Sequence, residues 1–143
     1  MTESLERFVQ AQASTYDHAL LELRHGRKEG HWMWFIFPQL RGLGVSEKAT
    51  YFGLRGIDEA RDYLHHPLLG PRLERATRAV LDSEVALEKL LGTIDAMKFA
   101  SCMTLFAAAA GEHSVYSLAL TSGGVRVDSR TLELLKEQNE KHV

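Results

Sequence analysis

The chain has 143 residues, with 17 lysines and arginines against 19 aspartates and glutamates, a net charge of -2. This near-balance provides no overall field that would attract nucleic acid or an anionic membrane. The single cysteine, Cys102, excludes an internal disulfide and any zinc site made of several thiolates. MTESLERFVQAQ, at the start, resembles no secretory signal, and no apolar run reaches the roughly 20 residues of a spanning helix. We expect a cytoplasmic protein that forms a single domain over residues 1–143.

Apolar residues recur at helical spacing from the first residues onward. The first helix is expected to begin at Leu5, continue to about Leu23 and end in the glycine-punctuated RHGRKEG. HWMWFIFP predicts a short buried helix or turn before Pro38, because a residue that precedes proline avoids the helical conformation. Ser46 is the expected N-cap of the next helix, whose first turn contains Glu47.

The second half of the chain continues with the same period. GIDEARDYLHH predicts a helix, Pro71 is expected as the first residue of another, and Ser83 begins a shorter one. DAMKFASCMTLFAAAAG is the most apolar segment, so we expect it to form the central helix and to end at Gly111.

HSVYSLALTSGG predicts a further short helix, and DSRTLELLKEQNEKHV predicts the last one, capped by Asp128 or Ser129. No alternating strand and no internal repeat is present. The sequence therefore predicts an all-α fold, a compact bundle of about seven or eight short helices.

The stretch HWMWFIFPQLRGLG, residues 31–44, supports two interpretations. Trp32 and Trp34 either fill the core, which is the commoner fate of such rings in a small domain, or form the wall of a pocket. Cationic side chains and glycine backbone amides flank the two tryptophans. Aromatic rings beside such groups are suited to binding a base or other flat ring attached to phosphate. The predicted ligand-binding residues are Arg27, His31, Trp32, Trp34, Gln39, Arg41, Arg72 and Ser101.

The expected central helix contains a polar band, because Asp95, Lys98 and Ser101 follow one another at intervals of three. Asp95 and Lys98 form either a structural ion pair or a cleft in which a desolvated lysine lies beside a carboxylate. Cys102 is expected to be inert core packing.

The seven histidines do not converge at any spacing typical of a metal site, since His65 and His66 are adjacent and no HxxxH or HExxH occurs. The GLG at residues 42–44 follows no strand and lacks the third glycine of a dinucleotide fingerprint. The sequence therefore predicts no metal ion and no cofactor.

Four stretches, AQASTYDHALLELRHGRKEGHWMWFIFPQLRGLGVS, YLHHPLLGPRL, KFASCMTLFA and DSRTLELL, carry a resemblance over nearly the whole chain. They resemble the small bacterial family catalogued as domain of unknown function number eighteen-ten. The resemblance implies an all-helical fold and brings no established activity. Family members are often labelled calpastatin, but that inhibitor is disordered and this sequence is rich in core residues. The chain departs from the family pattern at Ala100, where relatives commonly carry arginine or histidine.

The run SEKATYFGLRGIDEARDYL is similar in layout to a run in the helical glycosidases that act on ADP-ribosyl and ribityl-type N-glycosides. That likeness implies that Glu47 takes the place of their acidic residue. Leu54 stands nearest to the position of their lysine, so Lys98 or Lys48 would have to replace it. A carboxylate, Glu47 or Asp95, would stabilise the positive charge that develops on the sugar. The catalytic residues expected on this basis are Glu47, Asp95 and Lys98.

Together these features favour a helical domain that binds a nucleotide-like small molecule, with N-glycosidase activity as the enzymatic hypothesis. The alternative is a non-catalytic protein-interaction module that uses an exposed surface around Tyr51, Phe52 and Tyr63. We expect no membrane partner, and nucleic acid only as a substrate with a modified base. The sequence indicates no oligomeric state.

Overall fold

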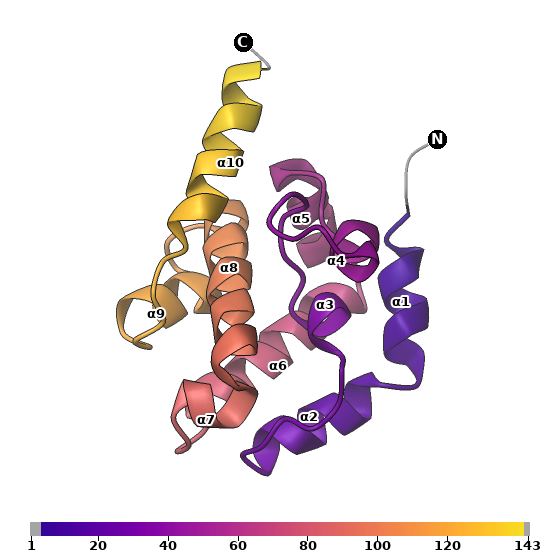
Figure 1. Ribbon diagram of the computed structural model, residues 1–143, viewed down its shortest axis with the longest axis vertical. Helices are drawn as coiled ribbons and strands as arrows, with labels where there is room; N and C mark the ends of the chain where they lie inside the picture. Colours follow the sequence, from indigo (N-terminus) through magenta and orange to yellow (C-terminus); the bar gives the residue numbers. More distant parts are fainter. Residues whose placement is uncertain (1–3, 142–143) are drawn as a thin grey trace.

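The computed structural model describes residues 4–141, and over that range the chain forms ten α-helices and no strand (Figure 1). The expected all-α class is confirmed, but the helices outnumber the seven or eight that were expected. In chain order they are α1 (Glu6–Ala13), α2 (Tyr16–Arg24), α3 (Met33–Ile36), α4 (Glu47–Phe52), α5 (Ile57–His65), α6 (Leu69–Asp82), α7 (Leu87–Leu91), α8 (Thr93–Ala110), α9 (Val115–Thr121) and α10 (Ser129–Lys141).

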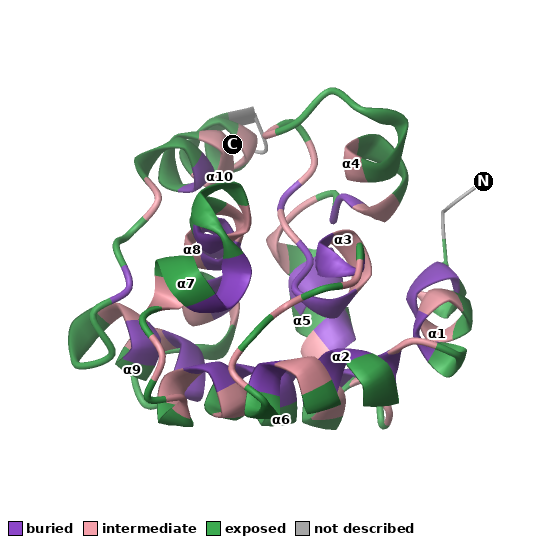
Figure 2. Ribbon diagram, turned by 60° about the horizontal axis from the view of Figure 1, so that its bottom comes forward, coloured by how far each residue is buried: buried purple, intermediate pink, exposed green. Residues whose placement is uncertain are grey.

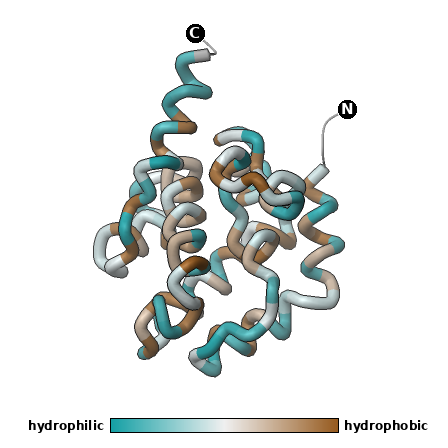
Figure 3. Tube along the Cα trace, viewed as in Figure 1, coloured by the Kyte–Doolittle hydropathy of each residue, from teal (hydrophilic) through white to brown (hydrophobic). Residues whose placement is uncertain are grey.

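Helix α8 is the centre of the fold, as its apolar sequence predicted. It is the longest helix, at 18 residues, and α5, α7, α9 and α10 pack against it. Phe99 and Phe106 on α8 are fully buried. The helix ends at Gly111, whose φ of 98° favours glycine. Helix α8 contains buried residues, whereas α4 has none (Figure 2). Hydrophilic residues dominate α10 by contrast (Figure 3). None of the helices between residues 4 and 141 is both long enough and apolar enough to cross a membrane.

The first predicted helix is in fact two helices, because the chain turns at Ser14 and Thr15. Serine and threonine favour helix ends over helix interiors, since their hydroxyls compete for backbone hydrogen bonds. The turn lets α1 pack against α3 while α2 packs against α6, which one straight helix of this length would not do.

Ser46 caps α4 as expected, since its hydroxyl accepts the Ala49 N–H at 3.1 Å. No residue of α4 is fully buried, and its packing against the core comes from Phe52, whose ring centroid lies 5.3 Å from that of Phe35. The chain on either side is also fixed by backbone pairing between the strand-like residues Leu40 and Leu54. The Arg41 N–H donates to the Leu54 carbonyl at 2.7 Å, and the Leu54 N–H donates to the Gln39 carbonyl at 2.9 Å.

Three helix starts differ from or refine the expectation. Helix α6 begins at Leu69 and not at Pro71, because His66 Nδ1 accepts the N–H groups of Leu68 and Leu69 and caps the helix. Helix α7 begins at Leu87 and not at Ser83. Asp128 caps α10, since its carboxylate accepts the Thr131 N–H at 3.0 Å.

A buried amide joins four helices near the core. Gln12 Nε2 on α1 donates to the Phe35 carbonyl at 2.7 Å and to the Tyr63 hydroxyl at 3.1 Å, and Gln12 Oε1 accepts from Arg72 at 3.4 Å.

Tyr63 is 0% exposed. The surface that an interaction module was expected to use therefore loses Tyr63, which belongs to the core because its ring packs between Phe8 and Phe106.

Glu22, on α2, holds the segment that leads into α3. Its Oε1 accepts the N–H groups of Glu29 at 2.7 Å and Gly30 at 2.9 Å, and Trp32 Nε1–H at 3.0 Å. Partial burial by itself would raise the pKa of Glu22, but these donors outweigh it and the pKa is lowered. The ionised carboxylate therefore stabilises the folded chain.

We expect Glu22→Gln to lower the free energy of unfolding by about 1 kcal/mol at neutral pH, because an amide accepts these hydrogen bonds less strongly. The folded-state pKa of Glu22 is depressed. The ionised carboxylate therefore adds to the free energy of unfolding above the unfolded-state pKa, and this contribution is lost as pH falls through the folded-state pKa. Urea unfolding of both proteins between neutral and acidic pH should show the difference shrink on acidification. The exposed Glu88→Gln serves as a control, and a difference that persists in acid would contradict the assignment.

Candidate functional site

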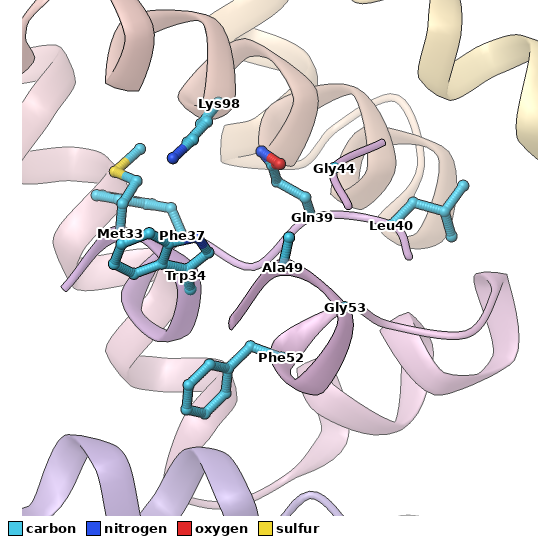
Figure 4. Close-up of a pocket in the computed structure, with 10 residues that line it drawn as sticks. All are labelled: Met33, Trp34, Phe37, Gln39, Leu40, Gly44, Ala49, Phe52, Gly53 and Lys98. Atoms are coloured by element: carbon cyan, nitrogen blue, oxygen red, sulfur yellow. The ribbon is translucent and has the colours of Figure 1, made fainter. Parts of the chain in front are cut away.

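Two adjoining cavities lie beside α3 and share Met33, Trp34 and Lys98. The larger, which we call the groove, has a volume of about 460 Å³ and lies between the segment that precedes α3 and the start of α8. The smaller, the inner cavity, has room for about 10 Å³ and lies between α3 and the chain around α4 (Figure 4). The groove is also lined by Lys28, His31, Leu91, Gly92, Thr93, Ile94 and Asp95, and the inner cavity by Phe37, Gln39, Leu40, Gly44, Ala49, Phe52 and Gly53.

An ion pair between distant segments lines the groove. Lys28 Nζ lies 2.8 Å from Asp95 Oδ2, and the Lys28 side chain is 8% exposed. The same ammonium donates to the Gly30 carbonyl at 2.6 Å, while the Lys28 N–H donates to the Leu90 carbonyl at 2.8 Å. Lys28 therefore fastens the segment before α3 to the junction of α7 and α8. No local sequence pattern indicates that Lys28 pairs with a carboxylate 67 positions later.

The two tryptophans have different environments, and each of the two interpretations applies to one of them. Trp32 is 1% exposed, its indole N–H is satisfied by Glu22, and its ring packs near Phe37, so it belongs to the core. Trp34 is half-buried and lines both cavities. Trp32 lines neither cavity, because its ring is enclosed in the core.

Two ammonium groups lie over the Trp34 ring. Lys98 Nζ, from α8, is 4.7 Å from the ring centroid, and Lys48 Nζ, from α4, is 4.9 Å from it. Lys98 also lies 3.7 Å from Asp95 Oδ1, at the outer limit of an ion pair. Figure 4 shows the Lys98 side chain reaching from α8 toward Trp34, with the Gln39 amide turned toward α8. The predicted Asp95–Lys98 pair thus exists, and it forms part of a cavity wall.

The remaining predicted residues lie outside the two cavities. Glu47 is exposed on α4, and Arg27 is exposed before α3. Arg72 lies on α6 with its guanidinium 4.9 Å from the Tyr16 ring, and its hydrogen bond to Gln12 is structural. Arg41 lines neither cavity.

Ser101 is buried and donates to the Met97 carbonyl at 3.2 Å, so the helix itself satisfies its hydroxyl. Of the predicted site residues, the structure brings together His31, Trp34, Gln39, Asp95 and Lys98.

Three ammonium groups lie in or beside the groove. Lys28 and Lys98 line it together with the Asp95 carboxylate, and Lys48 reaches the Trp34 ring. The Glu22 carboxylate also acts on Lys28. The first turn of α8 also lines the groove, and helix N-termini favour negative charge. Two apolar side chains of that helix, Ile94 and Met97, are 70% and 68% exposed. The arrangement suits an anion attached to an apolar or aromatic group.

A metal ion has no comparable set of ligands in the part of the chain that the structure describes, where no three histidine, cysteine or acidic side chains gather. Cys102 is buried, and burial raises the pKa of its thiol well above the ordinary value. The thiol is therefore held in its unreactive protonated form, as expected of a core residue.

A solved structure shares this fold and much of this sequence. It is the crystal structure of the conserved hypothetical protein Rv1873 from Mycobacterium tuberculosis, which is 46% identical in sequence with a TM-score of 0.86. The match covers 92% of this chain and 96% of that one. Comparison with curated proteins gives no match, so nothing there supports the likeness to N-glycosidases.

The family described as "Protein of unknown function (DUF1810)" matches residues 2–135 of this chain. The resemblance expected from the sequence is thereby confirmed, and it extends over nearly all of the helices described above. The chain belongs to the DUF1810 family.

Proposed function

We propose that the groove binds a nucleotide-like small molecule, with the inner cavity beside it having room for about one water molecule. The observation that carries this proposal is the position of Trp34, a half-buried ring at the junction of two cavities with two ammonium groups over it. An aromatic face beside cations can stack on a base while the cations contact a negatively charged group. A cytoplasmic location, expected from the sequence, is part of the same proposal.

The dimensions and the polar groups of the site fit such a ligand. The groove volume of about 460 Å³ lies within the usual range for small-molecule sites. Gln39 lines the inner cavity beside Lys98, where its amide can reach the edge of a heterocycle in the groove through a bridging water. Lys98 borders both cavities, so its ammonium can contact an anion in the groove while the ring lies against Trp34.

A second candidate function, cleavage of an N-glycosidic bond, is favoured by one observation. The Asp95 carboxylate lines the same groove as Trp34 and lies between the ammonium groups of Lys28 and Lys98. A carboxylate in that position could stabilise positive charge on a sugar. Glu47 lies outside both cavities, so in this proposal Asp95 takes the role for which Glu47 and Asp95 were both considered.

Binding is tested by calorimetric titration with adenosine, adenosine 5′-monophosphate and nicotinamide mononucleotide. We expect at least one of them to bind, and Trp34→Leu to weaken its affinity about tenfold or more, because stacking on an aromatic ring contributes about 1–3 kcal/mol per base. Tyr51→Leu, which removes an exposed aromatic ring outside the cavities, should leave affinity unchanged. Absence of binding across the panel at millimolar concentration, or equal binding by Trp34→Leu, would refute the proposal.

Turnover is tested separately by chromatographic detection of free base released from the same compounds. If the site hydrolyses N-glycosides, Asp95→Asn should abolish release and Glu47→Gln should retain it. Glu88→Gln, which removes an exposed carboxylate of α7 outside both cavities, is the control and should retain release. Because Asp95→Asn also weakens the ion pair with Lys28, calorimetric binding by Asp95→Asn is measured alongside, and retained binding shows that the groove persists. Binding without any release of base by the unmodified protein would exclude the glycosidase and leave the binding function intact.

A further inference from the structure

The fold does not depend on the contact between Lys48 and Trp34. It is exposed, it lies in a helix with no buried residue, and no ion pair involves it within residues 4–141. Lys98, the other lysine over the ring, is 28% exposed and also reaches Asp95. Of the two ammonium groups over Trp34, the one from Lys48 is therefore the more easily moved.

This inference rests on the proposed function. We propose that the Lys48 ammonium covers the Trp34 ring only until a ligand binds, which we call its placeholder role, and that the natural ligand is phosphorylated. The entering base displaces the Lys48 ammonium from the indole, and this ammonium then contacts the phosphate of the same ligand. Lys48 is thus a specificity-determining residue that selects nucleotides over nucleosides.

The exchange follows from the relative strengths of the two contacts. The attraction between an ammonium group and an aromatic face is weak where the ammonium remains solvated. A hydrogen bond from an ammonium group to a phosphate oxygen is charge-assisted and stronger. The displaced lysine consequently gains more from the phosphate than it loses at the ring. A nucleoside offers no such compensation, so it must displace Lys48 at a net cost.

The position of α4 makes the movement feasible. Its flanking residues are held by the pairing of Leu40 with Leu54, while the helix itself has no buried side chain. Gly44 and Ala49 of this segment line the inner cavity, which shares Trp34 and Lys98 with the groove, so Lys48 lies at one edge of the candidate site. A lysine side chain has enough rotatable bonds to move from the ring face toward the groove without movement of the helix.

The experiment compares adenosine 5′-monophosphate with adenosine by calorimetry, using the full chain and Lys48→Met. We expect the unmodified protein to prefer the monophosphate. Lys48→Met should weaken monophosphate binding about tenfold, the lower range for loss of one charge-assisted hydrogen bond, and raise adenosine affinity, because no ammonium group then has to be displaced. Lys48→Arg should retain the monophosphate preference. Lys89→Met, which removes an exposed lysine of α7 outside both cavities, should change neither affinity.

The outcomes separate this inference from the function on which it rests. If adenosine and its monophosphate bind equally well, or if Lys48→Met weakens both to the same extent, the placeholder role is refuted and the nucleotide-like site remains. If Lys48→Met leaves the preference for the monophosphate unchanged, Lys48 does not contact the phosphate and the inference is again refuted. If neither compound nor nicotinamide mononucleotide binds, the proposed function itself fails.

Discussion

The groove exists because Lys28 and Asp95 meet. These residues are far apart in the sequence, and their contact of 2.8 Å brings the segment before α3 onto the first turn of the central helix. The lysine is nearly enclosed, so separating the pair would leave a charge with little access to water. The ion pair therefore fixes the position of Trp34 relative to Lys98, which belongs to α8. Four helices pack around α8 and hold it in place.

The contrasting fates of Trp32 and Trp34 show how neighbours decide whether an aromatic ring is core or surface. Trp32 can be buried because Glu22 accepts its indole N–H and, with the same oxygen, two backbone N–H groups of the adjoining turn. Trp34 lies two positions further on and faces the cavities, where lysine side chains from α4 and α8 cover it. The aromatic stretch is thus both a packing element and one wall of the candidate site.

Much of the fold follows from local sequence rules, whereas the site depends on contacts between distant residues. Helical periodicity predicted the all-α class, and the apolar sequence of α8 predicted its central position. Ser46 and Gly111 marked the start of one helix and the end of another. The break at Ser14 was missed because the apolar spacing continues across it. The site was only partly foreseen: the Asp95–Lys98 pair has a helical spacing, but no local pattern marks Lys28 as the partner of Asp95 or brings Lys48 to Trp34.

A double-mutant cycle on Lys28 and Asp95 tests most directly whether their ion pair holds the groove together. Urea unfolding of the unmodified chain, Lys28→Met, Asp95→Asn and the double variant gives the coupling free energy between the two side chains. We predict a coupling of about 2 kcal/mol, because the pair is largely enclosed, and less than about 0.5 kcal/mol for the exposed pair of Arg130 and Glu133. Additive effects of the two substitutions would show that the contact does not hold the groove together and would contradict the account.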